Sequence, residues 1–531
     1  MKKVFFISLI LLFVLNIKSQ PLSRFYNNIN GNEFGSNVVI KDENRYLITT
    51  FGICDPGTGN SKKCRTFLAL NSKDEIVKVR KFINWFKFAE SVNLQITNDT
   101  IYAFGINEEI WGEKTSWNIY KTNFRGDSLD FFTYEEFDDV VVFPVAMQIK
   151  GDYIYLLGRH YNWWTYRQDY IVIVKIDKHG KKIKEIKYGE GHKVLNMAFS
   201  MIKTIDGDFM VSGWIINSDY KEFIRPFIVK FDENLNLLEE KKLGTYWQSG
   251  INFPYLTGLL DRGVVVTNGF YVPDRIDELG VEYKKYELYP ATIHKFDKGG
   301  NPIWSDTLWT LIERGTVGAR KRIKKLITAK NGDVIGCGYY RDVDQKRWGY
   351  LIRINSTDGD IKWEKKYEES RYPNAKSIFW DVKEAENGDI VVTGEMDSNE
   401  GWGGDDSYTW LLRVDSMGCF EPGCEKIDTV QLIYTESDYI SGTSEVISDY
   451  SYGEGIVVYP NPATSLIYVD FNVIDKIYMW DIIDIQGDKM LSGTKESIKE
   501  IDVSGLQAGI YFLRIQNKDN KVNSCKFVVE R

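Results

Sequence analysis

Residues 329–338 read Ala-Lys-Asn-Gly-Asp-Val-Ile-Gly-Cys-Gly, a tight Asn-Gly turn followed by a short apolar segment that closes on Gly338. Apolar segments that close on glycine occur seven times, at 46–52, 101–105, 153–158, 209–213, 264–269, 334–338 and 390–394. Their closing glycines are 53, 53, 55, 56, 69 and 56 residues apart. A nearly fixed period of this length indicates a repeat architecture, and it decides the fold.

A second marker recurs at the same period. The next apolar segment of each unit ends at an Asn or Asp, namely Asn71, Asn123, Asp177, Asp232, Asp297, Asn355 and Asp415. Several of these residues open a turn that closes on glycine, as in 177–180 and 297–300, which is typical of a β-hairpin. Four short antiparallel strands per unit are the signature of a β-propeller blade, so the sequence predicts seven blades.

The ring should close through the N-terminus. The seventh unit lacks an obvious fourth strand after Asp415, whereas residues 22–29 are strand-like and precede the first unit. We therefore expect this segment to complete the last blade, which would remove both free sheet edges.

Composition excludes one class of function. The chain has 531 residues, 14% of them aromatic, which suits strands, and a net charge of −8. A domain-wide basic excess is missing, so we expect no nucleic-acid partner. Residues 1–19 are predicted to be a signal peptide, because Lys2 and Lys3 precede an apolar run over 4–15 that is too short to span a bilayer. The mature chain is expected to be exported without a membrane span.

Six cysteines suit an oxidising compartment. Cys54 and Cys64 bracket a glycine-rich loop, and Cys419 and Cys424 bracket a second short loop, so two local disulfides are predicted. Zinc is the alternative, but these spacings are not those that zinc usually takes. Cys337 is expected to be a buried thiol.

The chain then changes character. Residues 20–426 are assigned to the propeller, and 427–455 to a mobile acidic linker rich in Ser and Tyr. Residues 456–531 form a second, smaller β-domain. It opens with Tyr-Pro-Asn-Pro-Ala at 459–463, turns at 486–488, and continues through Ser-Gly-Leu-Gln-Ala-Gly-Ile-Tyr-Phe-Leu-Arg at 504–514 to a terminal strand with basic ends at 526–531.

At these residues the chain resembles the type A C-terminal sorting domain of type IX secretion cargo. The matching positions are Tyr459, Pro460, Asn461, Pro462, Gly487, Gly505, Leu506, Gly509, Tyr511 and Arg514. The resemblance implies a small antiparallel sandwich recognised by the outer-membrane translocon. It also implies that a sorting peptidase removes the domain after transit, followed by release or attachment at the cell surface. Separately, segments 297–304 and 355–363, which end in Trp304 and Trp363, resemble the turns of bacterial propellers with Asp-containing repeats.

The sequence contains no recognisable catalytic motif. Its four histidines are scattered, and it has no metalloprotease motif, phosphate loop or nucleophile elbow. No catalytic residue and no cofactor are therefore assigned. Oxygen-bearing residues after Asp397 resemble the start of a calcium loop, but the third ligand position is a glycine and a closing glutamate is missing.

Aromatic residues are frequent between the second and third strands of the units. The candidates for ligand binding are Trp111, Trp117, Tyr161, Trp163, Trp164, Trp348 and Trp402. Such loops share one face of a propeller, so these rings are predicted to form a binding surface for a glycan or a protein. Loop anchoring or blade packing is the alternative. A polysaccharide hydrolase or lyase with carboxylates in the central funnel is a second hypothesis, and a spacer without a ligand is a third. Binding ranks first, because the sequence identifies no catalytic carboxylate pair.

Overall fold

A computed structural model shows a chain built from β-strands. It describes residues 22–27, 34–41, 45–53, 63–70, 76–83, 93–108, 115–125, 127–134, 141–161, 170–189, 194–217, 224–243, 254–269, 275–276, 282–283, 291–308, 320–342, 346–369, 375–397, 407–420, 424, 429–432, 439–441, 446–447, 456–459, 463–471, 477–494, 500–517 and 522–530. Within these ranges no helix is long and apolar enough to cross a membrane.

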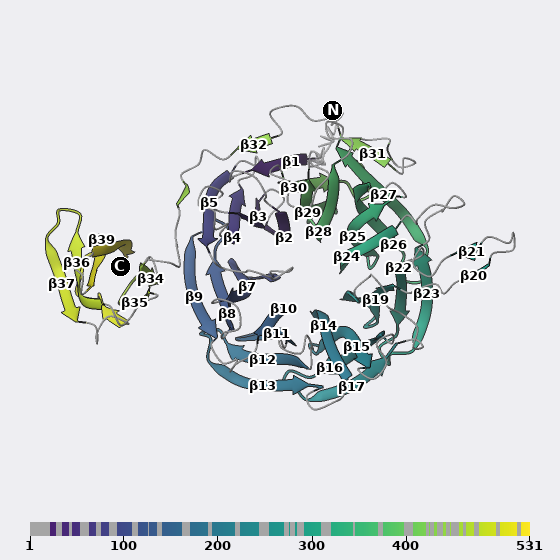
Figure 1. Cartoon of the computed structure of the whole chain (residues 1–531), viewed down its shortest axis with the longest axis horizontal. Coiled ribbons are helices and arrows are strands. Elements are labelled where there is room, and N and C mark those ends of the chain that lie inside the picture. The colour runs from purple at the N-terminus through teal and green to yellow at the C-terminus, as the bar shows by residue number, and fades with distance from the viewer. Residues whose placement is uncertain are drawn as a thin grey trace, which may run out of the picture.

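Seven sheets stand around a common axis and form the predicted seven-bladed propeller (Figure 1). Blade one contains β2 (Phe34–Lys41), β3 (Arg45–Ile53), β4 (Lys63–Leu70) and β5 (Ile76–Ile83). Blade two contains β6 (Asn93–Thr97), β7 (Thr100–Glu108), β8 (Thr115–Thr122) and β9 (Ser128–Tyr134). Blade three contains β10 (Val141–Lys150), β11 (Tyr153–Tyr161), β12 (Ile171–Asp177) and β13 (Lys182–Tyr188). Blade four contains β14 (Val194–Lys203), β15 (Phe209–Asn217), β16 (Ile224–Phe231) and β17 (Leu237–Lys242).

The remaining blades follow the same order, with the first strand of each innermost (Figure 1). Blade five contains β18 (Leu256–Gly258), β19 (Val264–Gly269), β22 (Ala291–Phe296) and β23 (Pro302–Leu308), and a small hairpin of β20 (Arg275–Ile276) and β21 (Glu282–Tyr283) is inserted in it. Blade six contains β24 (Arg320–Thr328), β25 (Val334–Arg341), β26 (Arg347–Ile354) and β27 (Ile361–Glu369). Blade seven contains β28 (Lys376–Glu384), β29 (Ile390–Asp397), β30 (Ser407–Val414) and β1 (Leu22–Asn27).

The N-terminal strand closes the ring. β1 pairs antiparallel with β30, in a register that joins Leu22 to Arg413. The indole Nε1 of Trp410 donates a hydrogen bond of 2.9 Å to Ser23 Oγ, and both side chains are buried. The prediction that the N-terminal segment completes the last blade is confirmed.

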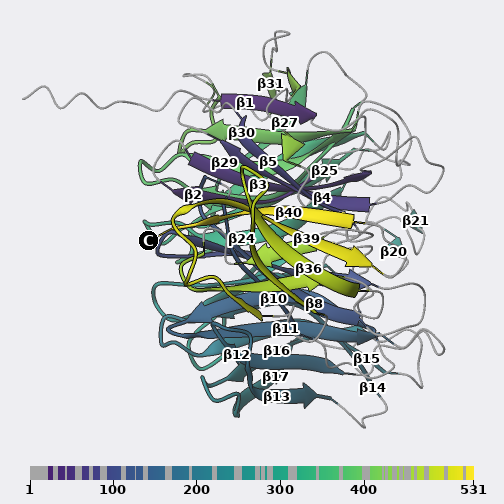
Figure 2. The ribbon, with the colours of Figure 1, turned by 90° about the vertical axis from the view of Figure 1, so that its left-hand side faces the viewer.

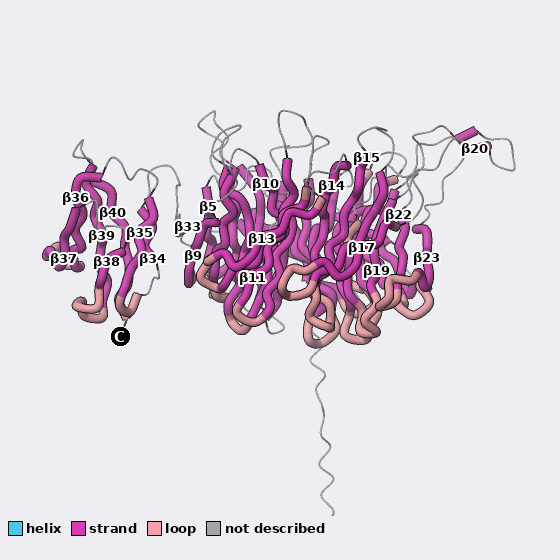
Figure 3. The backbone as a smooth tube through the Cα atoms, turned by 90° about the horizontal axis from the view of Figure 1, so that it is seen from below, coloured by secondary structure: helices cyan, strands magenta, loops and turns pink. Residues whose placement is uncertain are grey.

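The turns between third and fourth strands share one geometry. In blade three, Asp177 Oδ1 accepts hydrogen bonds of 2.8 Å and 2.9 Å from the backbone N–H groups two and four residues later. Gly180 then takes a φ of 87°, where a side chain would be strained. Asp232, Asp297 and Asp415 accept the same two hydrogen bonds, and the residue with positive φ is then Leu235, Gly300 and Gly418, respectively. The described turns gather on one side of the ring, at the bottom of Figure 3, and we call this side the turn face.

These turns also join neighbouring blades. The Trp304 indole on blade five donates a 3.1 Å hydrogen bond to the carbonyl oxygen of Ser356 in the turn of blade six. Trp363 of blade six does the same to Ser416 of blade seven, at 3.2 Å. A Cβ placed on Gly418 would meet the Trp363 ring at 2.9 Å, so the turn glycine leaves room for the preceding blade. The Trp-ending repeats therefore act in blade-to-blade packing.

Described parts of residues 427–455, which the sequence predicts to be a mobile linker, pair with the propeller. Three short strands within them, β31 (Thr429–Leu432), β32 (Tyr439–Ser441) and β33 (Val446–Ile447), pair in parallel with outer strands of the propeller. Their partners are β27, β1 and β5, in blades six, seven and one. These three strands thus lie along the sheet edges on both sides of the ring closure, where unpaired backbone groups would otherwise be available to other chains.

The C-terminal domain is a two-sheet antiparallel sandwich. One sheet consists of β34 (Ile456–Tyr459), β35 (Leu466–Phe471) and β38 (Glu500–Asp502). The other has β36 (Ile477–Asp484) between β37 (Lys489–Thr494) and β39 (Gly509–Asn517), with β40 (Val522–Val529) outermost, as Figure 2 shows for β36, β39 and β40. Buried side chains of both sheets, among them Ile467, Ile482, Leu513 and Phe527, form its core.

Candidate ligand-binding site on the inner ring

A β-bulge in the innermost strand explains four of the seven closing glycines of the repeat. The pairing of first and second strands skips one residue in blades three, four, six and seven, opposite Gly158, Gly213, Gly338 and Gly394. A Cβ on Gly394 would clash with the carbonyl oxygen of Ile378, and one on Gly338 would clash with that of Arg322. Glycine is therefore required where the backbone of the bulge approaches most closely.

The sequence suggests that the second strands end at these glycines, but in the structure they continue beyond them. β29, for example, continues three residues past Gly394 to Asp397. Each bulge therefore brings together two positions in the two innermost strands of a blade, the skipped residue of the first strand and the residue after the glycine of the second. We call the residues at these positions the inner ring. Its described members are Val145, Arg159, Phe199, Trp214, Lys324, Tyr339, Trp380 and Glu395.

Blades six and seven bring charged and aromatic members of the inner ring together. The Lys324 ammonium nitrogen lies 4.3 Å from the centroid of the Trp380 ring, which belongs to the neighbouring blade. The Trp380 indole in turn donates a hydrogen bond to the carboxyl group of Glu395. Two skipped residues and one post-glycine residue thus form a chain of contacts across the blade boundary.

Two arginines of blade six lie close to the ring of Tyr339, which belongs to the same blade. The guanidinium carbon of Arg322 lies 5.6 Å from the centroid of the Tyr339 ring, and that of Arg347 lies 5.3 Å from it. Both distances are typical of cation–π contacts. Tyr339 is buried, whereas Arg322 and Arg347 are half-buried. The two arginines therefore lie between the core of the blade and the solvent.

Glu395 is the most strongly perturbed carboxyl group of this region. Burial raises the pKa of Glu395 to about 7, although the Trp380 hydrogen bond and the charges of Lys324 and Arg347 oppose the increase. Asp397, two residues along the same strand and therefore on the same sheet face, adds to the increase. A carboxyl group with this pKa exchanges a proton near neutral pH, so it can donate or accept a hydrogen bond.

Blades three and four form the aromatic part of the inner ring. The Phe199 and Trp214 rings meet edge to face, with centroids 4.8 Å apart. The Arg159 guanidinium lies 5.8 Å from the centroids of both Phe143 and Phe199. The inner ring therefore repeats the combination of arginine and aromatic rings that is present on blade six.

The structure corrects the prediction for Trp117. This residue lies within β8, is fully buried, and donates a 2.7 Å hydrogen bond to the Val142 carbonyl oxygen of blade three. A Cβ on Gly158 would clash with its ring. Trp117 therefore packs blade two against blade three and has no surface to offer a ligand.

Trp348 is half-buried and lies beside Tyr340, with ring centroids 5.5 Å apart. The Lys346 ammonium lies 4.9 Å from the Trp348 centroid. Tyr340 follows Tyr339 in β25, so this pair occupies the sheet face opposite to Tyr339. The structure does not bring Trp348 to the inner ring. Trp111, Trp163, Trp164, Trp402 and the side chain of Tyr161 lie outside the described residues, so their predicted role stays a prediction.

The structure places the cysteines as follows. Cys419 and Cys424 are bonded, with Cα atoms 5.4 Å apart, as predicted. Their loop is anchored on blade six, because Lys365 Nζ donates a 2.8 Å hydrogen bond to the Cys424 carbonyl oxygen. Cys337 is a buried thiol whose pKa burial raises well above the ordinary value. The predicted bond between Cys54 and Cys64 lies outside the described residues.

Among the residues that the structure places, no group of three or more His, Cys, Asp or Glu side chains could hold a metal ion. Asp397, the suggested start of a calcium loop, is buried at the end of β29. The acidic residues that follow it at 405 and 406 lie outside the described ranges. The calcium site stays a sequence hypothesis.

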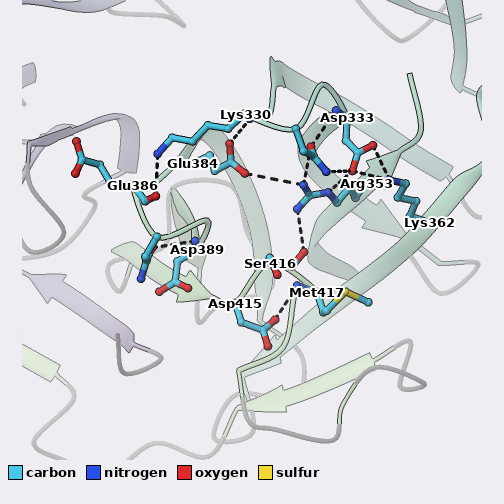
Figure 4. A network of polar contacts seen from close by, with 12 residues as sticks. Lys330, Asp333, Arg353, Lys362, Glu384, Glu386, Asp389, Asp415, Ser416 and Met417 are labelled. Carbon is cyan, nitrogen blue, oxygen red and sulfur yellow. Dashed lines mark hydrogen bonds and ion pairs between the residues drawn. The ribbon is translucent and has the colours of Figure 1, made fainter. Parts of the chain in front are cut away.

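The turn face has its own polar network (Figure 4). Arg353 of blade six is buried and contacts Asp333 Oδ2 at 2.8 Å, while its Nη1 donates a 3.0 Å hydrogen bond to the Ser416 carbonyl oxygen of blade seven. Burial alone would raise the pKa of Asp333, but hydrogen bonds from Lys362 and Arg353 hold it below the ordinary value. Equivalent pairs recur in other blades as Lys230–Asp208, Lys295–Asp261 and Arg413–Asp389. A contact that repeats from blade to blade indicates a structural role.

In the C-terminal domain the motif residues hold the sandwich together. Leu506 and Tyr511 are buried, and the Tyr511 hydroxyl donates a 3.0 Å hydrogen bond to the Gln507 carbonyl oxygen. Arg514 binds Asp481 through two hydrogen bonds of 2.7 Å and 2.8 Å. Gly487 takes a φ of 91° in a turn that Asp484 opens. Pro460, Asn461, Pro462 and the side chain of Tyr459 lie outside the described residues.

Comparison with known families identifies this domain. Residues 457–530 match the family described as the secretion system C-terminal sorting domain. The protein is thus cargo of the type IX secretion system, in which a sorting domain follows an all-β propeller, and it reaches the cell surface or the extracellular space. No sequence among the curated proteins is similar to the chain.

Solved structures are similar to the chain at low sequence identity and low TM-score. An α-L-arabinofuranosidase of Fusarium graminearum, in complex with arabinobiose, is 10% identical over 62% of this chain and 94% of that chain, with a TM-score of 0.40. An α-L-arabinanase of Penicillium chrysogenum is 12% identical over 61% and 92%, with a TM-score of 0.39. The extracellular domain of a hybrid two-component system from B. thetaiotaomicron is 12% identical over 96% and 58%, with a TM-score of 0.39.

Proposed function

We propose that the exported propeller is a binding module for a glycan or a protein, and that its ligand contacts the inner ring. The observation that supports this is the Lys324–Trp380–Glu395 chain of contacts across blades six and seven. Aromatic faces suit sugar rings and apolar side chains, and the charged groups beside them supply directional hydrogen bonds. The positions themselves arise from the repeat, but their side chains differ from blade to blade, as expected of a site rather than of packing.

A glycan and protein-ligand array probed with the purified full-length protein tests this proposal. We expect retention of a ligand that Trp380→Ala abolishes. Trp348→Ala is the matched control, because it also removes a half-buried indole of the same region of the propeller but not one of the inner ring. Loss of binding in Trp348→Ala with full binding in Trp380→Ala would locate the site on the predicted loop aromatics instead.

A hydrolase or lyase acting on polysaccharide is the second candidate function. The observation that favours it is the Glu395 carboxyl group, whose pKa is about 7, with the Asp397 carboxyl group on the same strand face. A carboxyl group that remains protonated near neutral pH suits a general acid, and a second carboxyl group is the usual partner in glycoside cleavage. Product release from polysaccharides by the wild-type protein, lost in Glu395→Gln, would support catalysis. Binding without any product release supports the binding module.

A further inference from the structure

The inner ring and its immediate surroundings are rich in cationic side chains, although the chain as a whole carries a net charge of −8. Among the described side chains there, the cationic ones are Arg159, Arg322, Lys324, Arg341 and Arg347, and the acidic ones are Glu395 and Asp397. A local charge opposite in sign to that of the whole protein attracts ligands that the rest of the surface repels. The number of cations among these described side chains therefore points to an anionic ligand.

The geometry narrows the class of that ligand. Lys324 stands over the Trp380 ring at 4.3 Å, and Arg322 and Arg347 lie 5.6 Å and 5.3 Å from the Tyr339 ring. Cations that stand over the faces of aromatic rings, with the opposite face of the ring left for a ligand, fit a ring-shaped ligand that carries an oxyanion. The apolar face of a sugar ring can stack on the indole face opposite to Lys324, while a carboxylate or sulfate group reaches the ammonium or guanidinium groups.

Partial burial strengthens such contacts. Lys324, Arg322, Arg347 and Trp380 are half-buried, so a ligand that reaches them meets charges already partly removed from water. Charge-assisted hydrogen bonds are stronger in this setting than on an open surface. Arg159 beside Phe143 and Phe199, on blades three and four, offers a second place of the same chemistry. Two such places on one ring suit a polymer with repeated charged sugars.

We infer that the inner ring binds an anionic polysaccharide, through Lys324 and Arg347 at its uronate or sulfate groups and through Trp380 at a sugar ring. This inference rests on the proposed binding function and specifies its ligand class. It assigns the cations of blade six to recognition, whereas the cations of the turn face, such as Arg353, are assigned to blade packing.

Paired polysaccharides test the inference with the full-length protein. Polygalacturonate is compared with its fully methyl-esterified form, and dextran sulfate with dextran, so that each pair differs only in its anionic group. We expect binding to at least one charged polymer and not to its neutral partner, with affinity that falls as salt rises. The first pair reports uronate recognition and the second reports sulfate recognition.

Variants of single cationic residues test which of them bind the anionic groups of the polymer. Lys324→Met and Arg347→Met should each lower the affinity for the charged polymer about tenfold, the loss of one charge-assisted contact. Lys178→Met is the matched control, because this lysine is exposed on the turn face, where it pairs with Asp152. It should bind like the wild type. Melting temperatures of the three variants establish that each is folded.

The outcomes separate the inference from the proposed function. Equal binding to charged and neutral partners, still lost in Trp380→Ala, would overturn the anionic ligand class but leave the binding site in place. Retention of a protein and of no polysaccharide would overturn the inference in the same way. An equal loss in Lys178→Met and Lys324→Met would show general charge attraction and would overturn the assigned site. Retention of double-stranded DNA in preference to both charged polysaccharides would also contradict it.

Discussion

The ammonium nitrogen of Lys324 lies 4.3 Å from the centroid of the Trp380 ring, although the two residues belong to different blades. Both are the residue that the pairing of a first strand with its second strand skips. A β-bulge that recurs with the blade period therefore presents side chains to one another around the ring axis. The position of the bulge comes from the repeat that determines the fold, whereas the side chains at that position differ between blades and form the proposed site.

Replacing Trp117 by Ala should destabilise the propeller strongly. The indole is fully buried, bonded to Val142 and packed against Gly158, so its loss should cost about 3–5 kcal/mol of unfolding free energy. Trp348→Ala, at a half-buried position, should cost clearly less. Urea unfolding of both variants measures the difference. Equal losses would mean that Trp117 does not join blades two and three as described.

Replacing Gly394 by Ala tests the bulge. An added Cβ would clash with the Ile378 backbone oxygen, which cannot move without breaking the strand pairing, so we expect a loss of about 1–3 kcal/mol. Gly258→Ala is the control in the same propeller, because its Cβ would meet only the end of the Ile202 side chain, at 3.3 Å. That variant should stay within about 0.5 kcal/mol of the wild type. If both variants unfold alike, the close approach at the bulge is not real.

Glu395 should make stability depend on pH. Its pKa of about 7 in the folded protein lies above the ordinary 4.5, so the folded state binds the proton more tightly. The resulting stabilisation is complete below about pH 4.5 and is lost as the pH rises through about 7. Between about pH 5 and about pH 8 the wild type should lose about 2–3 kcal/mol more unfolding free energy than Glu395→Gln. Denaturation curves at the two pH values measure this, and parallel losses in the two proteins would refute the perturbed carboxyl group.

The sorting domain should depend on the pair of Arg514 and Asp481. Their two hydrogen bonds hold the pKa of Asp481 below its usual value and join β39 to β36. We expect Arg514→Ala to reduce the fraction of protein at the cell surface, and deletion of 456–531 to leave the protein in the periplasm. Ile485→Ala, at a highly exposed turn residue, should have no effect. Immunoblots of cell fractions report the distribution, and normal export of the deletion variant would contradict the role of the domain.

The fold could be predicted because its signals are local. The Asp-to-Gly turns and the apolar segments recur at one period, and each needs only a few neighbouring residues to be recognised, as at Asp177 and Gly180. The closure by β1 followed from a missing fourth strand. The sorting domain was recognisable because its turns, strands and core positions, such as Gly487 and Tyr511, occur together in order.

The site could not be predicted in the same way, because it depends on contacts between strands and between blades. The closing glycines marked the period, but the clash that makes Gly394 necessary becomes visible only when β28 is paired with β29. Trp117 was assigned to a loop because the start of β8 is not evident from its polar flanks. The attachment of β31, β32 and β33 depends on which sheet edges the propeller leaves open. One sequence signal for the site was available. The residue that follows the closing glycine differs between blades three, four, six and seven, where it is Arg159, Trp214, Tyr339 and Glu395.

Hydrogen–deuterium exchange of the full-length protein, with and without polygalacturonate, tests the location of the binding site most directly. We predict that the polysaccharide slows exchange in β24, β28 and β29, the strands that carry Lys324, Trp380 and Glu395. Exchange in the turns at Asp177 and Asp297, on the turn face, should not change. Protection of these turns, with no change in β24, β28 and β29, would contradict the assignment of ligand binding to the inner ring.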